Sequence, residues 1–299
     1  MLRSAGQGGR GIANPEPSAV DYPFTLVDVF GAQPLTGNPL AVVHDAGALD
    51  TEQMLRITRW LNFSETTFLV PPTDPAADYQ VRIFTPDREL PFAGHPTLGT
   101  CRAWLSSGGA ARDPMAIVQQ CGAGLVTVRR DGEKLAFAAP PLLRDGPVDE
   151  TKVAEVVDFL NIDRSIIVDI QWVDNGPGWI AVLLASAEAV LKVIPAARRP
   201  SRIDVGLVAP HAPDGPADFE LRAFFTDQAG NVREDPVTGS LNASIAQWLF
   251  ASGRATDSYV ASQGTAIGRA GRIGISRDAE GQVWVAGAAD ILSSGVFHL

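Results

Sequence analysis

Two short segments of similar composition carry the side chains best suited to acid–base chemistry. The first segment, residues 94–100, contains His95, and the second, residues 234–240, contains Asp235. The two copies lie 140 residues apart and share a proline, a glycine and a hydroxyl residue at matching places. Each copy follows a strand-like segment and leads into an apolar helix-like one. We therefore expect two similar halves that bring an imidazole and a carboxylate together in the cleft between them.

The proline of each copy predicts the start of a helix, because a first-turn residue needs no backbone donor. The residue before it, His95 or Asp235, then caps the helix, and histidine is a poor cap. Free N–H groups and a partial positive charge at two facing helix ends favour a bound carboxylate. The residues expected to contact it are Gly94, Gly239 and Ser240. Simple capping by Asp235 and a purely structural role for His95 remain open alternatives.

A second carboxylate, Glu65, stands where a predicted helix ends and an apolar strand begins. Burial at that junction would raise its pKa toward the working range of an acid or base. The alternative is an ordinary surface carboxylate at a strand end. A weaker pattern, Gln263 and Gly264 followed by Arg269, is compatible with an anion pocket or with a plain loop.

Composition narrows the choice of partners. The formal net charge of −10 and the pI of about 4.9 argue against nucleic acid or an anionic membrane, although a small anionic substrate is allowed. The sequence contains no apolar run of eighteen residues. Cys101 and Cys121 have no metal-like spacing and are expected to be reduced core thiols of a cytoplasmic protein. No motif of the sequence has the ligand spacing of a metal site, so we expect no metal ion.

Strand-like segments outnumber helical ones, which predicts an α+β fold. The expected helices begin near Asp50, Pro96 and Lys152, and Asp50 can cap the first of them because Gln53 follows three residues later. Residues 79–84 are expected to form a strand, and a pair of prolines at 140–141 suggests a boundary. We predict a disordered extension over 1–21, one domain from 22–140 plus 289–299, and a second domain from 141–288. Each domain is expected to be a curved, mostly antiparallel sheet around one helix. The absence of a Gly-x-Gly-x-x-Gly segment after the first strand disfavours a dinucleotide fold.

Several motifs together resemble the phenazine-biosynthesis PhzF-like family, over residues 22–299 and in the family's order. They are Asp28–Phe30, Thr36–Val43, Asn62–Thr66, Phe84–Pro86, Glu89–Gly99, Glu234–Ser240, Gln263–Gly264 and Gly268–Arg269.

The resemblance implies a diaminopimelate-epimerase-like fold of two pseudo-symmetric, barrel-like domains, usually in a homodimer, and cofactor-free isomerase chemistry. The family's characterised substrate is trans-2,3-dihydro-3-hydroxyanthranilate. Carried onto this sequence, Glu65 would shuttle a proton between carbons, while His95, Asp235 and Ser240 would hold the substrate. Asn38 belongs to one of the shared motifs and is taken as a further substrate-binding residue.

Two other functions stay open. Racemases and epimerases of the same fold use two facing cysteines, whereas this sequence has Gly94 and Asp235 in the corresponding regions. An amino-acid racemase or epimerase is therefore one alternative, and a non-catalytic small-molecule-binding protein is the other. In each case the expected partner is a small carboxylate.

Overall fold

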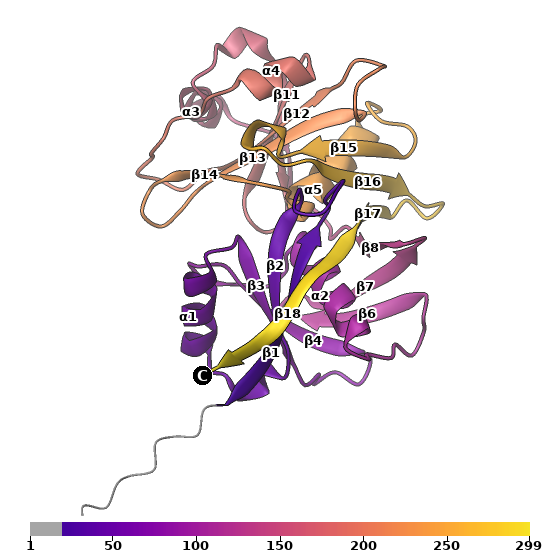
Figure 1. Cartoon of the computed structure of the whole chain (residues 1–299). Helices are drawn as coiled ribbons and strands as arrows, with labels where there is room; N and C mark the ends of the chain where they lie inside the picture. Colours follow the sequence, from indigo (N-terminus) through magenta and orange to yellow (C-terminus); the bar gives the residue numbers. More distant parts are fainter. Residues whose placement is uncertain (1–19) are drawn as a thin grey trace, which may run out of the picture.

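A computed structural model describes residues 20–299 of the chain, which fold into two barrel-like halves stacked end to end (Figure 1). The disordered extension predicted for 1–21 lies outside the described residues up to 19. For its last two residues the prediction is wrong, because Val20 exchanges backbone hydrogen bonds with Leu299 and Asp21 begins strand β1 (Asp21–Val29), where it pairs with His298. The predicted α+β fold, with a mostly antiparallel sheet around a helix in each half, is confirmed.

In the first half, eight strands wrap around helix α2 (Gly94–Ser106). We call this half the α2 barrel. Its strands follow the order β18–β1–β2–β3–β4–β6–β7–β8. Their bounds beyond β1 are Asn38–Val43 (β2), Glu65–Val70 (β3), Tyr79–Phe84 (β4), Ala116–Cys121 (β6), Gly124–Asp131 (β7), Lys134–Ala138 (β8) and Ala289–His298 (β18).

The second half repeats this arrangement around helix α5 (Gly239–Ala251), and we call it the α5 barrel. Its order is β9–β10–β11–β12–β13–β15–β16–β17. The bounds are Arg144–Pro147 (β9), Ile167–Asp174 (β10), Trp179–Leu184 (β11), Asp204–Pro210 (β12), Phe219–Thr226 (β13), Tyr259–Gln263 (β15), Gly271–Arg277 (β16) and Val283–Gly287 (β17). Pairing of β8 with β17 joins the two barrels into one continuous sheet.

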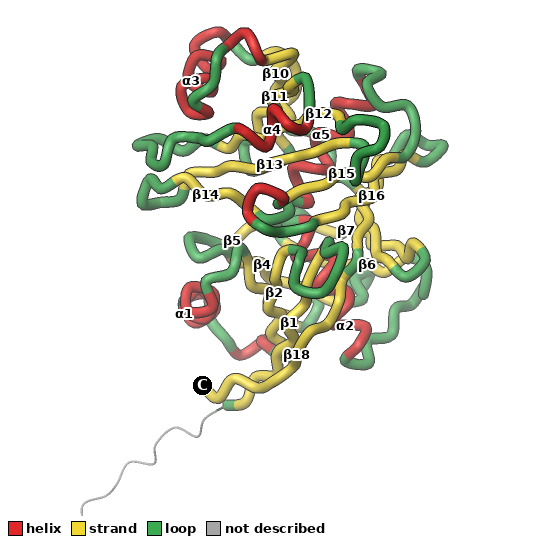
Figure 2. The backbone as a smooth tube through the Cα atoms, turned by 45° about the horizontal axis from the view of Figure 1, so that its top comes forward, coloured by secondary structure: helices red, strands yellow, loops and turns green. Residues whose placement is uncertain are grey.

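The two barrels also match in which of their neighbouring strands run parallel. The parallel pair β2–β3 has its counterpart in β11–β12, and the parallel pair β4–β6 has its counterpart in β13–β15. A two-residue strand β5 (Glu89–Leu90) and strand β14 (Val232–Asp235) pair with β4 and β13 at matching places. The two halves are thus built on one plan, which Figure 2 shows as two similar lobes.

Six further helices of the described residues connect the strands of the two barrels. They are η1 (Ala46–Ala48), α1 (Thr51–Leu61), α3 (Glu150–Leu160), η2 (Arg164–Ile166), α4 (Ala187–Lys192) and η3 (Thr265–Ile267). The predicted cap of α1 is confirmed, because the Asp50 side chain accepts from the Gln53 amide and Gln53 bonds back to Asp50. Helix α4 and strand β12 were not anticipated. Among residues 20–299, no helix combines the length and apolar character needed to cross a membrane.

The two central helices are largely buried because each is surrounded by sheet. In α2, every residue from Gly94 to Cys101 is buried, and in α5 the buried set includes Leu241, Ile245 and Leu249. The cores of both barrels form one continuous cluster along these helices. Packing therefore holds both helix N-termini in place where the barrels meet.

Candidate functional site

The N-termini of α2 and α5 touch at two glycines. A Cβ atom added to Gly94 would lie 2.8 Å from the Cα of Gly239, and one added to Gly239 would lie 2.8 Å from the Cα of Gly94. Real Cβ atoms do not come so close to backbone, so only glycine fits at either place. The glycines predicted to line a ligand site thus also allow the two helix ends to meet.

This contact corrects the expected alignment of the repeat. Both helices have 13 residues and start at the paired glycines, Gly94 and Gly239, which are 145 residues apart. His95 is therefore the second residue of α2 and matches Ser240, while Asp235 ends β14, before α5 begins. The predicted capping roles are wrong, because the caps are Ala93 and Thr238 and neither makes a side-chain cap bond.

Two of the predicted catalytic side chains face each other at this junction. The Nε2 atom of His95 lies 3.5 Å from Oε2 of Glu65, the first residue of β3. Neither atom has a hydrogen-bond partner among the described residues. The His95 side chain is 3% exposed and that of Glu65 is 16% exposed, so a small molecule would reach Glu65 first.

Asn38, the first residue of β2, determines which His95 nitrogen carries the proton. Its Nδ2 lies 3.3 Å from His95 Nδ1, 3.1 Å from Asp235 Oδ1 and 3.0 Å from the Val237 carbonyl oxygen. The two oxygens can only accept hydrogen bonds, so the group of Asn38 that faces them is its NH2 group, which donates. His95 Nδ1 then accepts, and the neutral ring carries its proton on Nε2, pointing to Glu65.

Asp235 is held across the junction by groups from both barrels. Ser64 of the α2 barrel donates to Oδ1 at 2.9 Å, and Thr238 of the α5 barrel donates to Oδ2 at 2.5 Å. With the Asn38 bond, the Asp235 carboxyl accepts three hydrogen bonds. Because hydroxyl and amide donors stabilise the charged form, Asp235 is the carboxyl of the site best suited to remain ionised.

Burial and proximity shift the pKa values of all three groups. Burial, aided by the nearby charge of Asp235, raises the pKa of Glu65 well above its ordinary value. Burial lowers the pKa of His95 to about 3, so the ring is neutral. Burial also raises the pKa of Asp235, against the opposing effect of its hydrogen bonds from Thr238, Ser64 and Asn38. Burial thus favours the uncharged forms of Glu65 and His95, while three hydrogen-bond donors favour the charged form of Asp235.

Gln263 lies behind Asp235, where its amide has partners on both sides. It donates to the Asp235 carbonyl oxygen at 3.1 Å and to the Thr238 hydroxyl at 2.9 Å, and it accepts from the Thr238 amide and from Asn242. The side chain is fully buried, and it fixes the Thr238 hydroxyl as a donor to Asp235. Gly264 forms the adjoining turn with φ +90°. The structure thus places Gln263 one layer below the surface of the site.

Ser240, the remaining predicted contact, has a partner that the sequence analysis missed. Trp179, at the start of β11, donates from its indole nitrogen to Ser240 Oγ at 3.1 Å. The Ser240 hydroxyl proton has no acceptor among the described residues, so it is available to a ligand anion. The sequence did not indicate Ser64 and Thr238 as residues of the site, although both carry hydroxyl groups and lie in the same motifs as Glu65 and Asp235.

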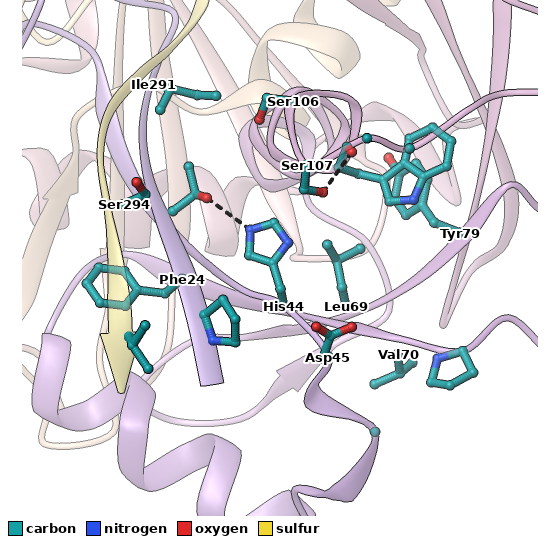
Figure 3. Close-up of a pocket in the computed structure, with 18 of the residues that line it drawn as sticks. Phe24, His44, Asp45, Leu69, Val70, Tyr79, Ser106, Ser107, Ile291 and Ser294 are labelled. Atoms are coloured by element: carbon teal, nitrogen blue, oxygen red, sulfur yellow. Dashed lines mark hydrogen bonds between the residues drawn. The ribbon is translucent and has the colours of Figure 1, made fainter. Parts of the chain in front are cut away.

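A large hollow lies away from these residues. It has a volume of about 1150 Å³ and lies beyond the C-terminal end of α2, opposite the end that carries His95 (Figure 3). Its lining includes the stacked rings of Tyr79 and Trp104 and the His44 side chain, which bonds Thr25 at 2.9 Å. None of the predicted site residues borders it.

Comparisons with known proteins agree with this architecture. A family model described as "Phenazine biosynthesis-like protein" matches residues 27–295. "Antisense-enhancing sequence 1" of Schizosaccharomyces pombe is 34% identical over 92% of this chain and 98% of its own length. The trans-2,3-dihydro-3-hydroxyanthranilate isomerase of Pseudomonas fluorescens is 33% identical over 77% of this chain and 81% of its own length.

Solved structures of other proteins share the fold over nearly the whole chain. The PhzF-family phenazine biosynthesis protein of Enterococcus faecalis aligns with a TM-score of 0.75 and 26% identity, covering 94% of this chain and 100% of that one. A hydroxyproline epimerase from Agrobacterium vitis shares the fold at a TM-score of 0.57 and 15% identity, covering 93% of each chain. The expected epimerase-like fold is confirmed, and the chain belongs to the phenazine biosynthesis-like protein family.

Proposed function

We propose that this chain, an isomerase of the phenazine biosynthesis-like family, shifts a proton between two carbons of a small carboxylated cyclic substrate. A compound resembling trans-2,3-dihydro-3-hydroxyanthranilate is the first candidate, because three relatives at 32–34% identity bear the name of its isomerase. The observation that carries the proposal is the pair Glu65 and His95, whose side chains face each other where two helix N-termini meet.

Glu65 is the proton carrier in this proposal. Its ionised carboxylate removes a proton from one substrate carbon, and the protonated carboxyl then delivers that proton to a second carbon, which regenerates the starting form. A raised pKa suits both steps, since it makes the carboxylate a stronger base and favours the protonated carboxyl that forms when the proton is taken up. The 16% exposure of Glu65 gives a substrate access to it.

The other groups of the site bind the polar parts of the substrate and orient it. His95 presents its Nε2–H beside Glu65, where a neutral donor can orient a polar substituent or the carboxylate itself. The free hydroxyl proton of Ser240 and the backbone N–H groups at the start of α2 and α5 suit the substrate carboxylate. Asp235 is positioned to accept a bond from a substrate amine or hydroxyl.

Substrate entry must separate groups that now bond across the junction. Asn38 and Ser64 belong to the α2 barrel, and both donate to Asp235 near the start of α5. We propose that a ligand replaces part of this network as it enters.

The test is exchange at carbon. The protein is incubated with candidate cyclic carboxylic acids in deuterium oxide, and both the isomerised product and deuterium incorporation are followed by NMR. Glu65→Gln should lower turnover by a factor on the order of 10² or more while ligand binding persists. Glu89→Gln is the matched control, since Glu89 pairs with Arg82 on the surface. Unchanged turnover in Glu65→Gln would remove Glu65 from the mechanism.

The same experiment separates the alternatives. Deuterium gained with inversion at an amino-acid Cα would indicate a racemase or epimerase instead. Ligand-induced stabilisation with neither isomerised product nor exchange for any substrate would indicate a binding protein that kept the fold.

A further inference from the structure

The proposed reaction leaves one electrostatic requirement unmet. Asp235 accepts three hydrogen bonds and is best suited to carry a charge, and Glu65 must be ionised to remove a proton from carbon. His95 is neutral, because burial lowers its pKa to about 3. A substrate carboxylate therefore meets two negative side chains and only the partial positive charges of two helix ends. A full positive charge near the site would offset this repulsion.

The α5 barrel has a counterpart of Glu65. Glu65 is the first residue of β3 and Asp204 is the first residue of β12, and these strands hold matching places in the parallel pairs β2–β3 and β11–β12. Across each pair, both residues have partners that belong to the barrel core. The partner of Asp204 is Trp179, whose indole donates to Ser240 in the first turn of α5. Asp204 therefore lies at the rim of the α5 barrel near the start of α5, as Glu65 lies near the start of α2.

Unlike Glu65, Asp204 is paired with an arginine. Arg202 forms a two-bond fork with it, from Nε to Oδ2 and from Nη2 to Oδ1, both at 2.9 Å. The Asp204 side chain is 5% exposed, whereas that of Arg202 is 45% exposed. Burial raises the pKa of Asp204, but the hydrogen bonds and charge of Arg202 oppose the rise. The carboxylate thus fixes the guanidinium at the rim, and among residues 20–299 no oxygen accepts a hydrogen bond from its third nitrogen, Nη1.

This guanidinium lies on the Glu65 side of the junction. Strand β3, which Glu65 begins, pairs with β4, and the turn over 85–88 follows β4. That turn reaches the α5 barrel, where Gln228 donates to the Asp87 carbonyl oxygen at 3.3 Å. The charge of Asp87 also acts on Arg202, whose pKa is raised first by its hydrogen bond to the carboxylate of β12. Arg202 therefore lies across the junction from the end of β4.

We propose that Arg202 binds the substrate carboxylate and supplies the missing positive charge of the site. Its free Nη1 donates to the carboxylate from the α5 side, while the fork with Asp204 keeps the guanidinium in place. The two matching carboxyls thus differ in role. Glu65, which has no arginine, moves the proton, and Asp204 is a positioning residue for Arg202. This inference rests on the proposed function, since it names the group that binds the charge of the proposed substrate.

The test measures binding of benzoate, a cyclic carboxylate that cannot isomerise, by calorimetry, so that no turnover is needed. Arg202→Gln should weaken binding about tenfold, because a hydrogen bond between charged groups is lost. Arg202→Lys should weaken it less, since the charge remains although the fork is lost. Arg254→Gln is the control. Arg254 pairs with Asp169 at 2.7 Å beyond the C-terminal end of α5, so its loss should leave benzoate binding unchanged.

Wild-type affinity for benzoate in a folded Arg202→Gln protein would overturn the proposal, and so would a wild-type protein that binds no benzoate. Removing Arg202 leaves Asp204 buried without a counter-charge, which destabilises the fold. A double variant with Arg202→Gln and Asp204→Asn removes both charges and should show the same loss of affinity; wild-type affinity there would equally contradict the proposal. The outcome is separable from the Glu65 test. Unchanged turnover in Glu65→Gln, together with weakened benzoate binding in Arg202→Gln, would reject the proton carrier and keep this binding role.

Discussion

The burial of a neutral His95 makes the stability of the protein depend on pH in a way that one substitution can isolate. The ring is 3% exposed, and its pKa is lowered from 6.5 to about 3 in the folded protein. The unfolded chain takes up a proton on His95 below pH 6.5, whereas the folded protein does not do so until about pH 3. The stability associated with the neutral ring is therefore complete above pH 6.5 and is lost as the pH falls.

The size of the effect follows from the shift. A fall from 6.5 to about 3, at 1.36 kcal/mol per pKa unit, corresponds to about 5 kcal/mol when fully developed. At pH 4, about 3 kcal/mol of this is already lost. Substituting His95→Gln removes the titration, because an amide stays neutral throughout. The carboxyls of the site are present in both proteins, so their contribution largely cancels in the difference.

The assay is denaturant unfolding of both proteins between pH 7.5 and pH 4, followed by tryptophan fluorescence. The free energy of unfolding of wild type should fall more steeply than that of His95→Gln, by about 3 kcal/mol over the interval. The two proteins need not be equally stable at neutral pH, since only the slopes are compared. Parallel curves would refute a buried, neutral His95 and the hydrogen-bond assignment built on it.

Three further predictions concern neighbouring residues. Glu65→Gln should raise the melting temperature near neutral pH, because the raised pKa of Glu65 makes its ionised form unfavourable in the folded state. That gain should vanish below about pH 4 in a thermal scan, and a loss of stability at pH 7 would contradict it. Gly239→Ala should destabilise the protein by about 1–3 kcal/mol in denaturant unfolding, because the added Cβ would lie 2.8 Å from the Cα of Gly94. Gly274→Ala is the control and should lower the free energy of unfolding by less, because a Cβ added there would make only ordinary contacts. Asn38→Leu removes the amide donor shared by three acceptors and should lower the free energy of unfolding by about 1–3 kcal/mol. The same variant tests the tautomer by nitrogen-15 NMR. A signal showing His95 still protonated on Nε2 would count against the role of Asn38 in fixing the tautomer.

Much of the fold could be predicted because its signals are local. The predicted strand over residues 79–84 matches β4 fully, and the cap at Asp50 needed only the spacing to Gln53. Helix α4 and strand β12 were missed. The helix has only six residues, too few for a periodic pattern to be recognised, and the strand has no polar alternation, because it is buried on both faces.

The site could be predicted only in part. The sequence singled out Glu65, His95 and Asp235 from their motifs, and the structure brings all three to one junction. It could not show that Ser64 of one barrel donates to Asp235 of the other, since these residues are 171 positions apart and share no pattern. The predicted alignment of the two segments was also wrong, because the prolines are 140 residues apart whereas the helices start 145 residues apart.

By itself, the sequence determined which residue types are available: a carboxylate at a strand start, an imidazole and a carboxylate near two helix starts, and glycines that tolerate close approach. Only the tertiary structure decided their protonation. Burial of His95 and Glu65, three donors on Asp235 and the orientation of Asn38 all depend on pairing between strands far apart in the chain. Desolvation and hydrogen bonding are properties of that assembled environment, and no local stretch of sequence contains them.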